Sequence, residues 1–242
     1  MEKKNRIDKL LANLGFGTRS EIKKIIKSGR VTVNGEMVKS PETKVGYEDD
    51  VVCDGVKAIL KEHIYYLLNK PAGCVCARED KLNETVFSYV DDTRKNLSPV
   101  GRLDKDTEGL LLITDDGELN HLLMSPAHHV KKTYEAVIDA PIEENAKELF
   151  KKGVDIGDDK PTSEAFLEII ENTNERCLVR LTIKEGRYHQ VKRMFEAIGR
   201  KVFYLKRVKL ANLDLDDTLK PGEYRELTET ELEELKKCVN LS

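Results

Sequence analysis

Gly101-Arg102-Leu103-Asp104-Lys105-Asp106-Thr107-Glu108-Gly109, followed by Leu110-Leu111-Leu112-Ile113-Thr114, is a charged segment that runs directly into an apolar one. An arginine and three carboxylates stand just before the apolar run, so charge lies where the backbone enters a core. Polar groups removed from water need partners to offset the cost. Local conflicts of this kind usually mark a functional site rather than a scaffold. The sequence therefore predicts a buried strand over residues 110–114 and a site in the loop before it.

The composition describes a protein with a real core beneath a heavily charged surface. The chain has 242 residues, of which 39% are hydrophobic and 35% charged, and its net charge is −3. This length suits one large or two modest domains. No apolar run approaches the roughly 18 residues of a membrane span, and the first residues lack the apolar core of a signal peptide. We expect a cytoplasmic protein without a membrane partner.

The cysteines give no sign of a disulfide framework or a metal site. They are Cys53, Cys74, Cys76, Cys177 and Cys238. Only Cys74 and Cys76 are close in sequence, and no second pair accompanies them. A zinc site or a set of disulfides would need more cysteines at regular spacing.

The first 57 residues predict a small module of two helices and a hairpin. Apolar residues recur at helical spacing over 6–14. Residues 18–21 fit a capping box, and the helix they begin gathers its isoleucines on one face. Residues 31–38 alternate around an Asn-Gly pair, which is the pattern of a tight β-hairpin. A third short strand is expected over 50–54.

This N-terminal region is strongly basic although the whole chain is not. Residues 1–44 hold eleven basic and five acidic side chains. A solvated helix face is the ordinary explanation for such a run. The two helices and the hairpin, however, resemble the S4 domain, a small RNA-binding module. That resemblance implies RNA contacts through Arg6, Arg19, Lys23, Lys27 and Arg30, of which the last four recur every three or four residues opposite the isoleucines.

Residues 58–63 are expected to be a linker, and residues 64–242 to be a second domain. Strands are predicted over 64–68, 110–114, 133–139, 165–170, 177–183 and 202–209. Helices are predicted over 118–124, 143–152, 188–198 and 228–239. Strands with interspersed helices and few parallel crossovers favour an α+β domain with a mostly antiparallel mixed sheet.

Two more motifs follow the acidic loop. Residues 185–195, Glu-Gly-Arg-Tyr-His-Gln-Val-Lys-Arg-Met-Phe, predict an amphipathic helix with a basic outer face. Residues 180–209 hold ten basic and two acidic side chains, a segregation that suits a surface following phosphates. Residues 131–137, Lys-Lys-Thr-Tyr-Glu-Ala-Val, run into the strand predicted over 133–139. Taken alone, His189 indicates a structural core residue and Tyr134 a packing one.

In this order the three motifs resemble the signature motifs of the RsuA branch of the pseudouridine synthases. With the N-terminal module, the resemblance covers nearly the whole chain. It implies that Asp104 is the catalytic aspartate, as nucleophile or as the base that removes a ribose proton. It also implies that the uridine leaves its stack, that Arg102 lies beside the flipped nucleotide, and that Tyr134 stacks on the base. Arg187 is implied to bind RNA.

A positive partner for Asp104 is needed because burial alone would raise the pKa of its carboxyl. By motif position this partner is Lys192, where many related synthases have arginine, and Arg193 is the fallback. Lysine lacks the bidentate geometry of a guanidinium. The implied reaction breaks a C1′–N1 bond, turns the uracil and rejoins it through C5. It needs neither a cofactor nor a metal.

The implied substrate is ribosomal RNA. The compact length and the absence of a basic tail favour 16S rRNA, in a pre-ribosomal small-subunit particle, over 23S rRNA. We expect a monomer. A non-catalytic S4-domain assembly factor would use the same basic surfaces with an inactive pocket, and intact Asp104, Tyr134 and Lys192 speak against it.

A calcium-binding EF-hand loop is the remaining alternative for residues 104–115. Asp104, Asp106, Glu108 and Gly109 nearly match its ligand spacing. The fifth position is Glu rather than Asp or Asn, and the twelfth is Asp, which is short for bidentate ligation. Pro99 and Gly101 also exclude the entering helix.

Overall fold

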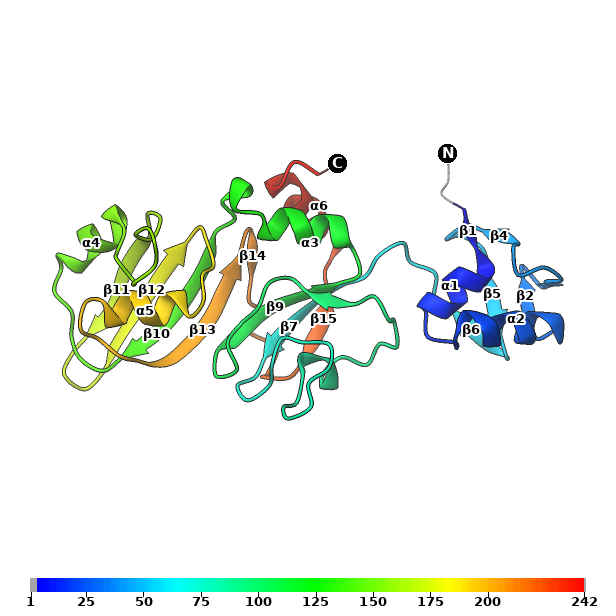
Figure 1. Ribbon diagram of the computed structural model, residues 1–242, viewed down its shortest axis with the longest axis horizontal. Helices are drawn as coiled ribbons and strands as arrows, with labels where there is room; N and C mark the ends of the chain where they lie inside the picture. Colours follow the sequence, from blue (N-terminus) through cyan, green and yellow to red (C-terminus); the bar gives the residue numbers. More distant parts are fainter. Residues whose placement is uncertain (1–3, 242) are drawn as a thin grey trace. The chain divides into compact units, whose positions relative to one another are not determined.

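The computed structural model describes residues 4–241, which form two compact units (Figure 1). The first comprises the chain up to Ile64 together with Asp91–Leu97, and the second comprises Tyr65–Val90 and the chain from Ser98 onward. Both units mix helices and strands, so the predicted α+β class is confirmed.

The first unit packs two helices against short strands. Its helices are α1 (Ile7–Asn13) and α2 (Arg19–Lys27). Its strands are β1 (Asn5–Arg6), β2 (Val31–Val33), β3 (Glu36–Met37), β4 (Lys44–Val45), β5 (Val51–Cys53) and β6 (Val56–Ala58). β1 pairs with β4, and the other four form a sheet in the order β3-β2-β5-β6. Ala58 thus ends a strand, inside the apolar core of this unit, where the sequence had predicted the start of a linker.

Local signals explain the elements of the first unit. The Thr18 hydroxyl accepts a hydrogen bond from the Glu21 amide, and the Glu21 carboxylate accepts one from the Thr18 amide at 2.7 Å. This reciprocal cap satisfies donors that the first helical turn leaves open. Asn34 and Gly35 have φ of 52° and 83°, as a tight hairpin turn requires. The predicted helices and hairpin are confirmed.

The second unit is built on one large sheet. Its strands are β7 (Tyr65–Lys70), β8 (Ser98–Pro99), β9 (Glu108–Thr114), β10 (Lys132–Ile138), β11 (Phe166–Asn172), β12 (Cys177–Ile183), β13 (Val202–Leu210), β14 (Leu213–Asp214) and β15 (Tyr224–Glu226). The main path runs β11-β12-β10-β13-β9-β7-β15, with β14 on β13 and β8 on β9. Only the β13–β9 pair is parallel among the described strands, so the mostly antiparallel mixed sheet is confirmed.

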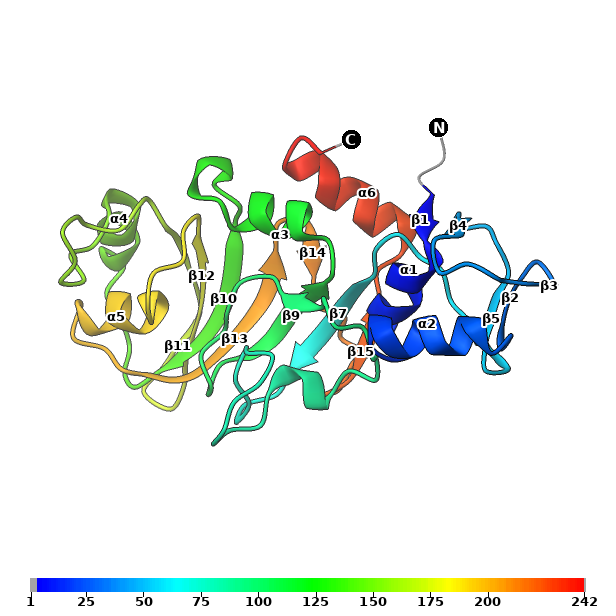
Figure 2. The same ribbon diagram turned by 45° about the vertical axis from the view of Figure 1, so that its right-hand side comes forward.

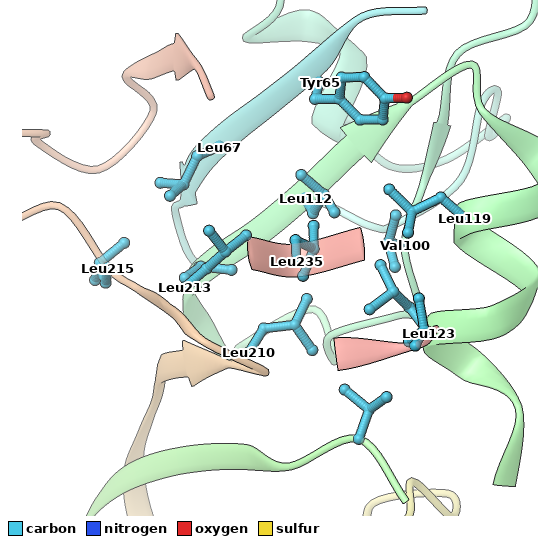
Figure 3. Packing of buried hydrophobic residues seen from close by; sticks show 13 residues of the cluster. Tyr65, Leu67, Val100, Leu112, Leu119, Leu123, Leu210, Leu213, Leu215 and Leu235 are labelled. Carbon is cyan, nitrogen blue, oxygen red and sulfur yellow. The ribbon is translucent and has the colours of Figure 1, made fainter. Parts of the chain in front are cut away.

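Four helices accompany this sheet: α3 (Gly117–Met124), α4 (Ala146–Lys152), α5 (Gln190–Glu196) and α6 (Glu229–Cys238). In both views α3 and α6 lie near each other beside β9 and β14 (Figures 1 and 2). Leu123 of α3 and Leu235 of α6 join Leu67 and Leu112 of the sheet in one buried cluster (Figure 3). Burying each leucine contributes roughly 2 kcal/mol, so this cluster anchors the half of the sheet from which the acidic loop departs.

The acidic loop ends where the backbones of two neighbouring strands approach so closely that only glycine fits. Gly109 has φ of 99° and lies opposite Arg207, where β9 runs parallel to β13. A Cβ atom at Gly109 would clash with the backbone oxygen of Arg207. The missing side chain lets the two strands approach, and it places the end of the loop beside β13.

Candidate active site

A cavity of about 630 Å³ opens in the second unit. Most of its lining comes from three segments: the acidic loop, strands β10 and β13, and the residues from Gly186 into the start of α5. Val75, Cys76, Met124 and Ile183 complete it. The three segments are those that carry the three motifs, although they are separated by tens of residues in the sequence. Among its lining residues Asp104 is the single carboxylate.

Lys70 holds the acidic loop in place. Its ammonium group donates to the carbonyl oxygens of Pro71 at 2.9 Å, Thr107 at 2.9 Å and Lys105 at 3.4 Å. The side chain is fully buried, and burial lowers the pKa of its amine. The amide of Gly73 adds a hydrogen bond to the Lys105 oxygen at 2.7 Å. The loop that carries Asp104 is therefore tied to the end of β7. Lys70 was not among the predicted site residues.

Asp104 lies in the cavity with two basic groups beside it. Its side chain is 27% exposed, with Nζ of Lys192 3.7 Å from Oδ2 and Nε2 of His189 3.6 Å from Oδ1. Lys192 also donates to both oxygens of Asp106, at 2.6 and 2.8 Å. That hydrogen bond is the main cause of the lowered pKa of Asp106. The structure thus brings Lys192 to Asp104, as the sequence predicts, but shares it with a second carboxylate.

A tight turn presents His189 to the cavity. Its backbone is left-handed, with φ of 48°, and its ring stacks on Tyr188 at 3.8 Å between centroids. The Gln190 side chain accepts from the Arg187 amide at 2.9 Å and donates to Glu185 at 2.8 Å, which fixes the turn. His189 is therefore a cavity residue, and the predicted core role is wrong. Its left-handed backbone could not be read from the helical pattern that follows it.

Tyr134 forms part of the cavity wall that strands β10 and β13 provide. It lies on β10 directly across from Arg207 of β13, and it is 8% exposed. Leu205 lines the same wall. An aromatic ring at the side of a cavity is suited to stacking against a flat heterocycle.

Two buried cations on this wall were not among the predicted site residues. Lys132 is 8% exposed, and its Nζ donates to the Val130 oxygen at 3.1 Å. Burial, with a smaller contribution from Arg207, lowers its pKa to about 8. Arg207 is 1% exposed, and its Nε donates to the Leu110 oxygen at 2.8 Å. Arg207 stands in a predicted strand, and Lys132 lies one residue before the strand predicted over 133–139. Lys132 shares the Tyr134 face by alternation, which was the available signal.

The three remaining arginines predicted to bind substrate or RNA differ in whether they line the cavity and in what their guanidinium groups contact. Arg102 is exposed at the cavity, and no hydrogen bond or ion pair of its side chain is found within residues 4–241. Arg187 lines the cavity, but its guanidinium is held by Asp158, Glu185 and the carbonyls of two loop residues. Arg193 does not line it, because its guanidinium is bonded to Asp158 and to the Ile156 oxygen. The fallback partner for Asp104 is thus directed elsewhere.

Three of the five basic residues predicted to bind RNA in the first unit are paired with carboxylates. Asp8, whose side chain is fully buried, binds Arg6 at 3.0 Å and Arg19 at 3.3 Å. These contacts, led by the hydrogen bond from Arg6, lower the pKa of Asp8. Arg30 pairs with Asp54 at 3.0 Å. Lys23 and Lys27 are exposed on α2, and the described part of the chain shows no ion pair for either.

The described residues contain no group of three or more His, Cys, Asp or Glu side chains that could hold a metal ion. The acidic loop also lies between strands β8 and β9, so it is not the connection between two helices that an EF-hand requires. Across residues 4–241, every helix is too short or too polar to cross a membrane.

Comparison with known proteins identifies a family for a segment in each of the two units. Residues 64–197 match the family model of RNA pseudouridylate synthases, and residues 5–52 match that of the S4 domain. The ribosomal small subunit pseudouridine synthase A of Haemophilus influenzae is 44% identical over 236 residues, covering 96% of this chain and 100% of that protein. The protein of the same name from Escherichia coli is 43% identical over 231 residues, covering 94% and 98%. A crystal structure of a pseudouridylate synthase superposes with a TM-score of 0.68 at 42% identity, covering 95% and 99%.

Proposed function

Because the chain belongs to the RNA pseudouridylate synthase family, we propose that it converts one uridine of 16S rRNA, in the small ribosomal subunit, to pseudouridine. The choice of 16S rRNA is supported by the names of relatives that match nearly end to end. The observation that carries the proposal is the cavity itself, which Asp104 and Tyr134 both line, with Lys192 and His189 beside Asp104. The runner-up is 23S rRNA.

The reaction needs an ionised carboxylate inside a pocket that retains a detached base. Breaking C1′–N1 sends the bonding electron pair to the uracil ring. Asp104 then either adds to C1′ or removes the C2′ proton, so that the sugar carbon is not left electron-deficient. The uracil turns, and C5 bonds to C1′ as the Asp104–C1′ bond breaks or, on the other route, as the removed proton returns to C2′. The C5 proton is then lost while N1 gains one. Lys192 and His189 place basic groups 3.7 and 3.6 Å from the oxygens of Asp104.

The uridine must leave its helical stack to reach Asp104, at a cost of about a few kcal/mol. We assign Tyr134 to stacking on the base and Arg102 to the flipped nucleotide or its phosphate. Lys192 acts on Asp104, whereas Arg193 and Arg187 hold the loop around Asp158. A guanidinium already bonded to a carboxylate can still give a remaining donor to RNA.

Sequence-independent affinity comes from the N-terminal module, which we assign to residues 1–57, followed by a linker at 58–63 and the catalytic domain from 64. Arg6, Arg19, Lys23, Lys27 and Arg30 contact phosphates in this proposal. The partner is a pre-ribosomal small-subunit particle in the cytoplasm, and the protein acts as a monomer without a cofactor.

The test is conversion of rRNA in vitro. Purified protein is incubated with 16S rRNA and with 23S rRNA that lack pseudouridine, and pseudouridines are mapped by chemical modification and primer extension. We expect one site in 16S rRNA. A site in 23S rRNA alone would move the substrate to the large subunit. Tight RNA binding without any pseudouridine would favour the assembly factor instead.

A further inference from the structure

The cavity wall contains two positive groups that have no negative partner. Lys132 and Arg207 are nearly fully buried, and neither forms an ion pair with any residue of the described chain. Within residues 4–241, each of the two side chains donates one hydrogen bond, to a backbone carbonyl oxygen. The Nη2 atom of Arg207 is buried without a hydrogen-bond partner among the described residues.

This arrangement is costly unless a ligand completes it. A buried cation loses its hydration and normally recovers free energy from a carboxylate. A buried donor that stays unpaired carries its own desolvation cost. Lys132 and Arg207 lie on the same face of neighbouring strands, because Arg207 is opposite Tyr134 and Lys132 is two residues before it. Both line the cavity. Both residues therefore border the space that a ligand enters, although Nη2 of Arg207 is itself closed off from water.

The continuity of RNA identifies which part of a nucleotide reaches these groups. The phosphates on both sides of a flipped nucleotide must lead back to the rest of the chain outside. The base is a terminal branch and can enter a closed space. Uracil offers two carbonyl oxygens, O2 and O4, as acceptors, and both take negative charge when the ring becomes an anion.

We propose that Lys132 and Arg207 bind a carbonyl oxygen of the flipped uracil and stabilise the negative charge that the ring acquires when C1′–N1 breaks. This deepens the proposed function and rests on it. The pair from the broken bond resides on N1 and is delocalised onto O2 and O4, next to two fixed cations. Breaking C1′–N1 moves no proton, and the electron pair returns to C1′ when C5 bonds there; the proton shift from C5 to N1 comes afterwards. Preorganised donors at such a position act most strongly where water is excluded.

The first experiment compares single-turnover rates on a 16S rRNA fragment. Lys132→Met should slow pseudouridine formation roughly 100-fold, the scale of losing one oxyanion donor. Lys132→Gln keeps a donor without charge and should fall between Met and wild type. The matched control is Lys131→Met, which removes the exposed neighbouring lysine and should leave the rate unchanged. Wild-type rates for all three variants would overturn the inference while leaving the proposed function intact.

The second experiment separates a ring contact from a structural effect. The target uridine is replaced by 2-thiouridine or by 4-thiouridine, because sulfur is a poorer acceptor than oxygen. The wild type should lose rate with one of the two, and Lys132→Met should lose much less with that same substrate. Equal sulfur effects in both proteins would overturn the inference, whichever rate the variant has.

A phosphate contact is the competing outcome, and it has its own signature. If Lys132 bound a phosphate, Lys132→Met would weaken RNA binding and reduce the slope of log affinity against log salt by about 1. We expect the binding slope to be unchanged, and a reduced slope would overturn the ring assignment. A wild type that makes no pseudouridine from the unmodified fragment would instead refute the proposed function.

Discussion

Lys192 is bonded more closely to Asp106 than to Asp104. Its Nζ lies 2.6 Å from Oδ1 of Asp106 and 3.7 Å from Oδ2 of Asp104. The Asp106 side chain is 72% exposed and that of Asp104 is 27% exposed, so the same ammonium group links a solvated carboxylate to a half-buried one. Asp106 thereby restrains a cation that would otherwise be free to close on Asp104.

Asp104→Asn should abolish pseudouridine formation and leave RNA binding within about threefold of wild type. The amide keeps the shape of the side chain but can neither attack C1′ nor remove a ribose proton. Release of tritium from rRNA labelled at uracil C5 measures turnover, and filter binding measures affinity. Residual turnover above background would remove Asp104 from the catalytic role.

Asp106→Asn should extend activity to lower pH. Without the second carboxylate, Lys192 is free to pair with Asp104 alone, which brings positive charge closer to the reacting carboxylate. The measurement is kcat/KM against pH from 4 to 8, where the acidic limb should move to lower pH.

The control for this prediction is Glu118→Gln, which removes an exposed acid at the start of α3. It should not move the acidic limb. If Asp106→Asn lowers activity equally at every pH, Asp106 has only a structural role in the loop.

Much of the fold could be predicted because its signals are local. The cap formed by Thr18 and Glu21, the turn at Asn34-Gly35 and the apolar run over 110–114 each depend on a few neighbouring residues. The short strands β8, β14 and β15 were not predicted. Each has two or three residues, and its partner strand rather than its own pattern determines that it forms.

The site was predicted only where a motif identified it. Counting bases over 180–209 suggested a phosphate-binding surface, yet Arg180 pairs with Glu135 and both Arg187 and Arg193 pair with Asp158. Linear charge does not equal surface charge once distant acids fold against it. The burial of Lys70 and Arg207 was not predicted either. A basic residue within a strand pattern is usually expected to be exposed, and nothing in the pattern distinguishes one that becomes buried.

Lys23→Glu combined with Lys27→Glu should weaken rRNA binding and flatten its salt dependence. Both lysines are exposed on α2, and each phosphate contact adds about 0.9 to the slope of log affinity against log salt. We expect the slope to fall by about 2. Lys151→Glu combined with Lys152→Glu on α4 is the control for the same change of charge at another helix. An unchanged slope in the double variant would remove this face of α2 from the RNA interface.

Lys132→Met should raise thermal stability at pH 7 by more than it does at pH 10. The pKa of Lys132 falls from 10.5 in the unfolded chain to about 8 in the folded protein. Between these values Lys132 binds more protons in the unfolded chain than in the folded protein. Its unfavourable contribution to the free energy of unfolding therefore shrinks as pH rises. At pH 7 the buried charge therefore costs on the order of 3 kcal/mol, which methionine avoids. Loss of the Val130 hydrogen bond offsets about 1 kcal/mol of this gain.

Thermal melts of wild type, Lys132→Met and Lys131→Met at both pH values make the comparison. A Tm difference that is the same at pH 7 and pH 10 would mean that Lys132 titrates normally. The expected result is a variant that is more stable and much slower, because the unpaired cation is retained for its effect on the substrate rather than for the fold.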